Sequence, residues 1–205
     1  MSKNEIMFKV ITLGDSGVGK TSIIRRYANN IFDENVLSTI GVGFAFKEVE
    51  LSNKKKIKLK LIDTAGQEKF KSLAKSYFKN VDGVLFVYSF EILESFQNLK
   101  EWIKLFNSNH YGKNGIPMFL VGNKSDLEEK DDVENNEKLV KEFLNEYNDL
   151  KYYKTSAKKD ISINELFKEL AEKIFAAYGK GGVHTQNSQL LKNFDEEKKQ
   201  HCKQC

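Results

Sequence analysis

The chain has 205 residues, of which 40% are hydrophobic and 30% are charged, and its 33 lysines and arginines against 29 aspartates and glutamates give a net charge of +4. This length accommodates one α/β domain with a buried core and a tail, but hardly two domains. The small, dispersed positive excess argues against a nucleic-acid-binding protein, and the sequence contains no apolar run long enough to cross a bilayer and no signal peptide. Its two cysteines are too few for a disulfide framework, so we expect a cytosolic protein.

Short apolar runs alternate with longer amphipathic segments along the chain. The runs at 8–14, 83–89 and 116–123 are typical of buried strands, and 56–63 alternates lysine with apolar residues as a half-exposed strand does. Residues 162–178 carry apolar side chains at the spacing of one helix face. This alternation predicts an α/β fold with an open, mostly parallel sheet, whose ligands bind at the carboxyl ends of its strands.

The first loop at such a position is GDSGVGKTS, residues 14–22. It fits the pattern G-x-x-x-x-G-K-[ST], follows a predicted strand and precedes a helical segment, as a phosphate-binding loop does. In such a loop, backbone N–H groups bind phosphate oxygens, Lys20 contacts the β- and γ-phosphates and the Thr21 hydroxyl binds Mg²⁺. A glycine-rich turn that binds nothing is the alternative. The predicted phosphate-binding residues in this loop are Ser16, Gly17, Val18, Gly19, Lys20, Thr21 and Ser22.

Two later stretches indicate which nucleotide is bound. NKSD, residues 123–126, follows a predicted strand, and a carboxylate there accepts both N–H groups on the N1 and N2 edge of guanine, which adenine lacks. TSAK, residues 155–158, follows KYYK at the end of the last predicted strand and supplies backbone donors for the base oxygen. Alone, NKSD could equally be a polar turn. The predicted guanine-binding residues in these two stretches are Asn123, Lys124, Asp126, Ser156, Ala157 and Lys158.

Together with STIG (38–41) and DTAGQEKF (63–70), these motifs resemble those of the Ras superfamily of small GTPases, and most of all the Rab family. The resemblance implies a single P-loop GTPase domain over 8–178, with a mostly parallel six-stranded sheet and helices on both faces. A short extension (1–7) precedes this domain, and a disordered tail (179–205) follows it. The resemblance also implies GTP and GDP as ligands, Mg²⁺ as cofactor, slow GTP hydrolysis and a switch function in vesicle trafficking.

The resemblance assigns roles to residues outside the phosphate loop. Thr39 is expected to bind Mg²⁺ through its hydroxyl and the γ-phosphate through its backbone N–H, Asp63 to hold Mg²⁺ through water, and Gly66 to contact the γ-phosphate. Gln67 is the predicted catalytic residue, because its amide can both accept from and donate to an attacking water. Phe32 is expected to stack on the guanine face, with a core contact as the alternative.

Hydrolysis is expected to be slow without a partner. Ser16 occupies a position where many relatives outside the Rab group have glycine, and its side chain would crowd an incoming arginine. Arg25 and Arg26 lie on the first helix, beyond the phosphates, and are expected to be surface residues. An activating protein is therefore expected to complete hydrolysis.

The resemblance also predicts a surface that partners recognise. The sequence departs from the Rab pattern at Ile62, where tryptophan is usual, at Gly43, where an acidic residue is usual, and at Val36, where tyrosine is common. These changes leave the identity of the partners open. The residues expected to face effectors are Ile40, Gly41, Val42, Gly43, Phe44, Ile62 and Tyr77.

Both cysteines lie in the last four residues, at Cys202 and Cys205, in a polar segment without periodicity. The weak positive charge of this tail cannot hold a membrane alone, whereas two prenyl chains can. Rab proteins end with paired, doubly prenylated cysteines, and these two resemble that arrangement. The alternatives are a box with only Cys202 prenylated, a redox or zinc pair, and unmodified thiols.

Three classes of function follow from these observations. The first is a GTP-hydrolysing switch, which would act with an exchange factor, an activating protein, a GDP-dissociation inhibitor, the prenylation machinery and effectors. It would be a monomer, without a nucleic-acid partner, that cycles between the cytosol and the cytosolic face of an intracellular membrane. The second is a nucleotide-binding scaffold that rarely hydrolyses. The third, a P-loop kinase or ATPase, conflicts with NKSD.

Overall fold

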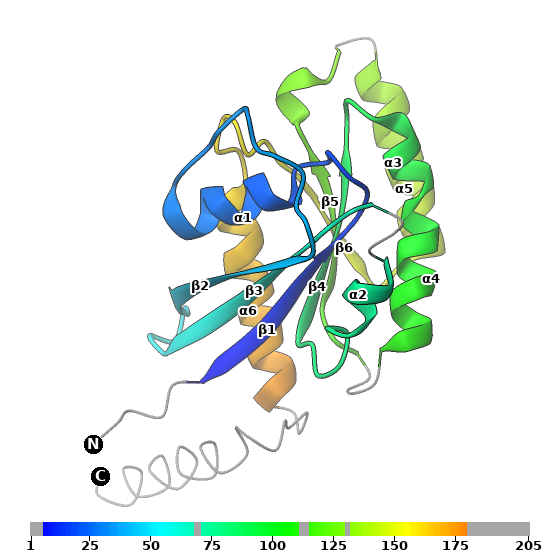
Figure 1. The fold of residues 1–205 in the computed structure, drawn as a ribbon. Helices are drawn as coiled ribbons and strands as arrows, with labels where there is room; N and C mark the ends of the chain where they lie inside the picture. Colours follow the sequence, from blue (N-terminus) through cyan, green and yellow to red (C-terminus); the bar gives the residue numbers. More distant parts are fainter. Residues whose placement is uncertain (1–5, 68–70, 111–114, 130–131, 180–205) are drawn as a thin grey trace, which may run out of the picture.

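The computed structural model describes residues 6–67, 71–110, 115–129 and 132–179 (Figure 1). The elements in chain order are β1 (Met7–Leu13), α1 (Lys20–Asn29), β2 (Val42–Glu50), β3 (Lys56–Thr64), α2 (Lys71–Lys75), β4 (Gly83–Ser89), α3 (Leu93–Gln97), α4 (Leu99–Asn109), β5 (Met118–Asn123), the 3₁₀ helix η2 (Ser125–Leu127), α5 (Val133–Glu146), β6 (Leu150–Lys154) and α6 (Ile163–Gly179).

The strands form one six-stranded sheet in the order β2-β3-β1-β4-β5-β6. Only β2 runs antiparallel to its neighbour β3, and every other pair of adjacent strands is parallel. The predicted α/β fold with a mostly parallel six-stranded sheet is therefore confirmed. All seven residues of β4 are buried, as expected for a central strand covered on both faces.

Helices cover both faces of the sheet (Figure 1), and the buried side chains form two cores. Buried residues of α1 and α6 belong to one core, in which the rings of Tyr27 and Phe167 stack with centroids 4.0 Å apart. Buried residues of α2, α4 and α5 belong to the other core, which contains Trp102 and Phe106 of α4. Residues of the sheet alternate between the two cores, so that Val10 belongs to the first and Ile11 to the second.

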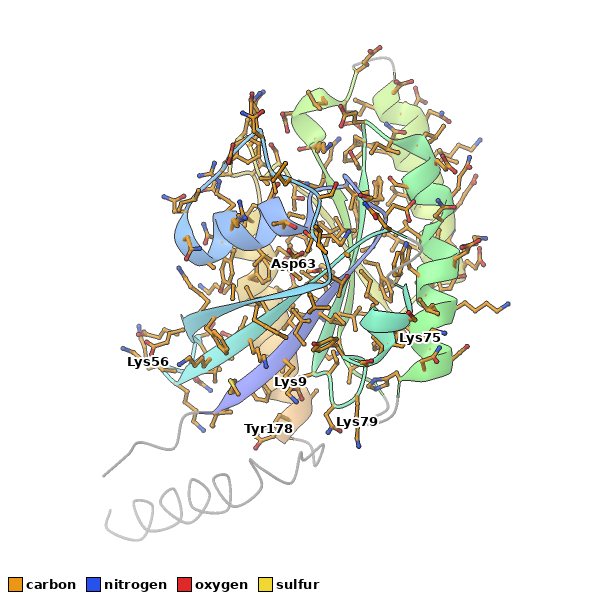
Figure 2. All side chains as sticks on the ribbon, viewed as in Figure 1. Lys9, Lys56, Asp63, Lys75, Lys79 and Tyr178 are labelled. Atoms are coloured by element: carbon orange, nitrogen blue, oxygen red, sulfur yellow. The ribbon has the colours of Figure 1, made fainter. Side chains whose placement is uncertain are left out.

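The two ends of the domain are fixed by apolar contacts. Ile6 is buried and β1 begins at Met7, one residue before the predicted start of the first strand. The helical pattern predicted over 162–178 forms α6, and its apolar face is buried as expected. Tyr178 lies near the end of α6 (Figure 2). Its ring packs edge-on against the ring of Phe8, with the two ring centroids 5.1 Å apart. The tail cysteines Cys202 and Cys205 lie outside the described residues.

The parallel strands bring four loops to one edge of the sheet. The segments that follow β1, β3, β5 and β6 all leave the carboxyl ends of parallel strands, and these segments contain the motifs that the sequence analysis singled out. No helix within the described ranges is both long and apolar enough to cross a bilayer.

Candidate functional site

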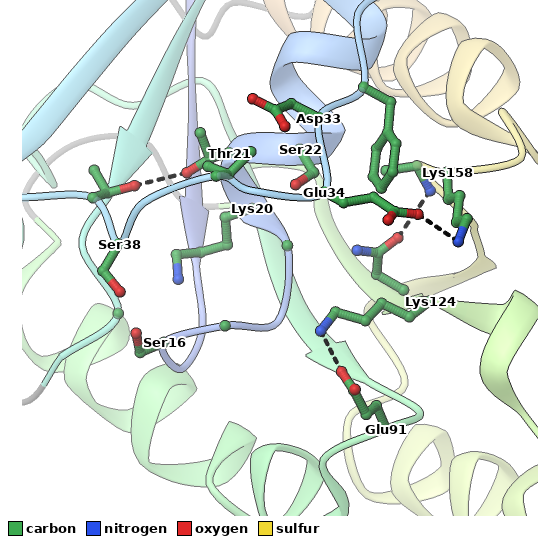
Figure 3. A pocket seen from close by; sticks show the side chains of 18 of the residues that line it. Ser16, Lys20, Thr21, Ser22, Asp33, Glu34, Ser38, Glu91, Lys124 and Lys158 are labelled. Carbon is green, nitrogen blue, oxygen red and sulfur yellow. Dashed lines mark hydrogen bonds and ion pairs between the residues drawn. The ribbon is translucent and has the colours of Figure 1, made fainter.

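A cavity of about 480 Å³ opens at this edge of the sheet (Figure 3). Its walls come from the loop after β1, the start of α1, the segment between α1 and β2, and the loops after β3, β4, β5 and β6. Of the residues predicted to bind phosphate or base, those that line it are Ser16, Gly17, Gly19, Lys20, Thr21, Ser22, Phe32, Thr39, Gly66, Asn123, Lys124, Asp126, Ala157 and Lys158.

The loop between β1 and α1 has a backbone that favours glycine. Gly19 has a φ of 95°, and a Cβ there would lie 2.3 Å from Nδ2 of Asn123, so any larger residue would displace that side chain. The helix α1 begins at the next residue, Lys20, so that its N-terminal end adjoins the cavity. A helix N-terminus with unpaired N–H groups favours anions.

Lys20 brings a cation to the floor of the cavity. Its side chain is only 5% exposed, and Nζ donates hydrogen bonds to the carbonyl oxygens of Gly14 at 2.9 Å and Asp15 at 2.6 Å. Burial lowers the pKa of the Lys20 ammonium to about 8, although the carboxylates of Asp63 and Asp15 oppose this shift. Both of these acceptors are neutral carbonyl oxygens, so the ammonium gains by exchanging them for charged phosphate oxygens.

Three oxygen-bearing side chains meet beside Lys20. The Thr21 hydroxyl donates to Oδ2 of Asp63 at 2.7 Å and lies 2.7 Å from the hydroxyl of Thr39, which is itself 3.5 Å from the same carboxylate oxygen. The other oxygen of Asp63, Oδ1, is buried and has no hydrogen-bond partner within the described part of the chain. Burial raises the pKa of Asp63, while the Thr21 hydrogen bond and the Lys20 charge act in the opposite direction.

This cluster suits a hard divalent cation. Hydroxyl and carboxylate oxygens are the ligands that Mg²⁺ prefers, and a buried carboxylate oxygen without a partner gains most from a cation. The described residues contain no group of three carboxylate, histidine or cysteine side chains that could hold a metal without help. The cluster of Thr21, Thr39 and Asp63 therefore fits Mg²⁺ that shares its coordination with the phosphates of a ligand.

Asn123, the last residue of β5, lines the cavity and joins two loops. It is 1% exposed; its Nδ2 donates to the carbonyl of Val18 at 2.9 Å, and its Oδ1 accepts from the backbone N–H of Ala157 at 3.2 Å. Val18 itself does not line the cavity, because its side chain is buried in the core formed with α1 and α6. The contribution of Val18 to the site is therefore made by its backbone.

Asp126 lines the cavity, and a hydrogen bond from Ser156 holds its carboxylate in place. The Ser156 hydroxyl, which is fully buried, donates to Oδ1 of Asp126 at 2.5 Å. Ser156 does not itself line the cavity, so its side chain acts by orienting the carboxylate. A fixed, acceptor-only carboxylate suits a ligand edge with two adjacent N–H groups, as guanine has.

Two ion pairs lie at the margin of the cavity (Figure 3). Lys158 pairs with Glu34 at 2.6 Å, and Lys124 pairs with Glu91. Phe32 both lines the cavity and packs against the core, so the structure accommodates both predicted roles of its ring.

Arg26 has a role that the sequence analysis missed. It was expected on the surface, but it is half-buried. Its Nε donates to the carbonyl oxygen of Ala157 at 2.8 Å, and its Nη2 donates to the carbonyl oxygen of Lys158 at 3.3 Å. Its Cζ lies 5.9 Å from the centroid of the Phe32 ring. These partners lie 131 and 132 positions away, so no local pattern in the sequence could indicate the contacts. Arg25 is exposed, as expected.

Asp15 was also not singled out by the sequence analysis. It belongs to the loop after β1, and its carboxylate accepts hydrogen bonds from Asn98 and Trp102 near the start of α4, at 2.7 Å each. The P-loop pattern leaves this position unspecified, so the motif gave no reason to single it out.

Gln67 follows the loop after β3 and is half-buried, but it does not line the cavity. It is the last described residue before 68–70. Its predicted catalytic role therefore stays a prediction.

The residues expected to face effectors differ in exposure. Ile40 is 87% exposed and Phe44 is 47% exposed, and the Phe44 ring lies 5.7 Å from that of Tyr77. Ile62 is only 2% exposed, so the expectation that its side chain faces a partner was wrong. It lies between Ile11 of β1 and Phe44 of β2 in the sheet and belongs to the core that α2 and α4 cover. Gly41, Val42 and Gly43 are half-buried.

Comparisons with known proteins complete the description. Residues 9–176 match the family model described as Ras family. The chain is 36% identical over 201 residues to the Ras-related protein Rab-13 of Mesocricetus auratus, covering 96% of this chain and 95% of that protein. It is 39% identical over 170 residues to the Ras-related protein Rab-1C of Dictyostelium discoideum, covering 83% of this chain and 82% of that protein. It is 35% identical over 184 residues to the GTP-binding protein ypt1 of Schizosaccharomyces pombe, covering 90% of this chain and 88% of that protein.

Proposed function

The chain belongs to the Ras family, within its Rab branch, and from this premise we propose how its residues perform the function of a GTP-dependent switch. The protein is a small GTPase that binds GTP and GDP with Mg²⁺ and acts in vesicle trafficking.

One observation carries the proposal. The oxygens of Thr21, Thr39 and Asp63 converge where β3 ends, and Oδ1 of Asp63 is buried without a partner among the described residues. The fixed carboxylate of Asp126 lines the cavity where β5 ends, and β1 and β4 separate β3 from β5 in the sheet. A guanine nucleotide has phosphates at one end and two adjacent N–H groups at the other. The cavity therefore offers complementary groups for both ends of one ligand.

At the phosphate end, the residues of this chain supply positive charge and hydrogen-bond donors. The backbone N–H groups of 16–22 and the start of α1 bind the phosphate oxygens, and Lys20 exchanges the carbonyls of Gly14 and Asp15 for the β- and γ-phosphates. Thr21 and Thr39, through their hydroxyls, and Asp63, through its carboxylate, would hold Mg²⁺ beside these phosphates. The cation, when bound, neutralises charge on the β- and γ-phosphates.

At the base end, Asp126 accepts from the guanine N–H groups while Ser156 holds its carboxylate in place. Asn123 joins the phosphate loop to the 155–158 loop. The N–H groups of Thr155 and Ser156 donate to backbone carbonyls, so we assign the base oxygen to the N–H of Ala157, which would exchange Asn123 Oδ1 for it. ATP presents a different donor pattern and would leave the Asp126 carboxylate without its donors.

Hydrolysis requires a positioned water more than a strong base, and we assign this positioning to Gln67. Its position outside the lining of the cavity agrees with a slow unaided reaction, because the side chain must first move towards the phosphates. Ser16, which does line the cavity, crowds the approach of an arginine from an activating protein.

The switch itself depends on the segment 33–41. Thr39 joins this segment to the cation cluster, while the neighbouring side chains Leu37 and Ile40 are 88% and 87% exposed. Loss of the γ-phosphate removes the contact that we assign to the Thr39 backbone N–H, and the exposed apolar side chains then lose part of their fixed arrangement. Effectors that dock on these side chains and on Phe44 would thereby recognise the GTP state.

Rab proteins act with exchange factors, activating proteins, GDP-dissociation inhibitors and effectors. For this chain we propose attachment to the cytosolic face of an intracellular membrane through prenyl groups on Cys202 and Cys205, because two chains hold a membrane stably where one is marginal. Intact mass measurement of the protein recovered from its own membranes tests this assignment: two prenyl groups support it, and a terminus without lipid contradicts it.

Nucleotide competition tests the proposed site. The purified chain is loaded with fluorescent GDP in the presence of Mg²⁺, and unlabelled GTP, GDP or ATP is added as competitor. We expect GTP and GDP to displace the label at equimolar amounts and ATP to fail even at a hundredfold excess. Equal displacement by ATP would refute the assignment of Asp126 to guanine.

A further inference from the structure

The carboxylate of Asp15 is bound by two side chains from the start of α4. Its Oδ1 accepts a hydrogen bond from Nε1 of Trp102, and its Oδ2 accepts one from Nδ2 of Asn98, at 2.7 Å each. The donors lie 83 and 87 positions further along the chain. Both carboxylate oxygens are therefore occupied by donors that belong to a different layer of the fold.

Both donors are held firmly. Trp102 is 1% exposed and belongs to the core beneath α4, and its indole N–H can only donate. Asn98 immediately precedes α4, yet its side chain makes no capping hydrogen bond to this helix, and its amide is directed to Asp15 instead. The position of the Asp15 carboxylate is thus set by the packing of α4.

The backbone of Asp15 contacts two residues to which we assign phosphate contacts. Its carbonyl oxygen accepts from Nζ of Lys20 at 2.6 Å. On the other side, a Cβ added to Gly66 would lie 2.2 Å from its carbonyl carbon, so the two backbones are in close contact. A displacement of Asp15 would therefore disturb Gly66, shift the loop that leads to Lys20 and, before the nucleotide binds, remove an acceptor of the Lys20 ammonium.

A carboxylate inside a phosphate-binding loop is unfavourable for an anionic ligand unless it is directed away and its charge is balanced. Asp15 meets both conditions: it does not line the cavity, although Ser16 and Gly17 do, and two N–H groups share its charge. Hydrogen bonds to a charged group are stronger than those between neutral groups.

We propose that Asn98 and Trp102 are positioning residues for nucleotide binding, which hold the Asp15 carboxylate out of the phosphate site and fix the loop that carries Lys20. The inference rests on the proposed function, because it requires a nucleotide in the cavity. Its consequence is that changes at the start of α4 alter how long the nucleotide stays bound.

Release of fluorescent GDP from the full chain, in Mg²⁺ and excess unlabelled GDP, measures this effect. Asn98→Ala removes one donor from a half-exposed position, and we expect release to become about tenfold faster, as the loss of one charge-assisted hydrogen bond predicts. Asn109→Ala is the matched control, because Asn109 lies at the other end of α4 and its amide donates to the carbonyl oxygen of Leu105 at 2.8 Å instead of to Asp15. Its release rate should stay within about twofold of the wild type, and equal rates for the two variants would overturn the proposal.

A second pair of variants separates charge from packing. Trp102→Phe removes the indole donor, and Phe106→Leu removes a similar part of the same α4 core without touching Asp15. We expect faster release only from Trp102→Phe. Adding Asp15→Asn to Trp102→Phe removes the freed charge and should slow release again, whereas a purely structural role predicts no such rescue.

Failure of the proposed function and failure of the positioning role give different results in these experiments. A wild-type chain that retains no GDP contradicts the proposed function itself. A wild type that retains GDP, with Trp102→Phe no faster than Phe106→Leu or with no rescue by Asp15→Asn, contradicts only the positioning role.

Discussion

The Oγ1 atom of Thr21 lies 2.7 Å from Oδ2 of Asp63, although 42 positions separate the two residues in the sequence. The contact joins the start of α1 to the end of β3, since β1 and β3 run parallel and end at the same edge of the sheet. Two motifs that are distant in the chain thus form one candidate cation site.

Removal of the Thr21 hydroxyl should abolish the effect of Mg²⁺ on nucleotide release. Thr21→Val keeps the shape of the side chain but deletes a cation ligand, whereas Thr21→Ser keeps the hydroxyl. We expect Mg²⁺ to slow GDP release at least about tenfold in the wild type and in Thr21→Ser, and to have no effect in Thr21→Val. If EDTA still accelerates GDP release from the Thr21→Val variant, the cation must be bound elsewhere.

Asp126→Asn should change the base that the cavity accepts. The amide keeps an acceptor but adds N–H groups that face the N–H groups of guanine, so affinity for GDP should fall at least about a hundredfold. Xanthosine diphosphate carries a carbonyl in place of the exocyclic amine and should bind the variant better than the wild type. Titration with both nucleotides measures the change, and Asp33→Asn, at another carboxylate that lines the cavity, should keep the guanine preference.

Arg26→Ala should loosen the loop at 156–158, because its guanidinium donates to the carbonyls of Ala157 and Lys158. We expect a loss of about 1–3 kcal/mol in the free energy of unfolding and faster GDP release. Arg26→Lys should not restore either quantity, since an ammonium cannot reproduce the planar donor fork. Arg25→Ala, at the exposed neighbouring position, serves as the control in chemical denaturation, and equal losses for both arginines would contradict this role.

The two isoleucines near the first switch should respond differently to truncation. Ile62→Ala removes a side chain that is 2% exposed and should lower the free energy of unfolding by about 2–4 kcal/mol. Ile40→Ala, at 87% exposure, should change it by less than about 0.5 kcal/mol while weakening effector binding. Chemical denaturation measures both values, and an unaffected Ile62→Ala would show that this side chain is not part of the core.

Local sequence patterns predicted an open, mostly parallel α/β sheet and the phosphate loop, whereas the number of strands and the roles of Phe32, Thr39 and Gly66 came from the family resemblance. The solid apolar run at 83–89 predicted the central strand β4 with its observed bounds, and the phosphate loop could be placed because its spacing is local. The positions of Lys20 and Asp126 in the cavity follow from the rule that ligands bind where parallel strands end.

The contacts that hold these loops in place could not be predicted in the same way. Arg26 reaches across 131 positions to Ala157, and Trp102 reaches back 87 positions to Asp15, so neither contact leaves a periodic trace in the sequence. Ile62 was misjudged because the resemblance assigns a role to its position, whereas burial depends on how closely β1, β2 and α2 pack around it.

The central claim is that this cavity binds GTP and hydrolyses it with the help of Gln67. The most direct measurement is single-turnover conversion of bound GTP to GDP by the purified chain, compared with the Gln67→Leu variant. The account predicts slow conversion by the wild type and at least about tenfold slower conversion by Gln67→Leu, with GTP retained by both. Equal conversion rates in the two proteins, or a wild type that keeps GTP unhydrolysed, would contradict it.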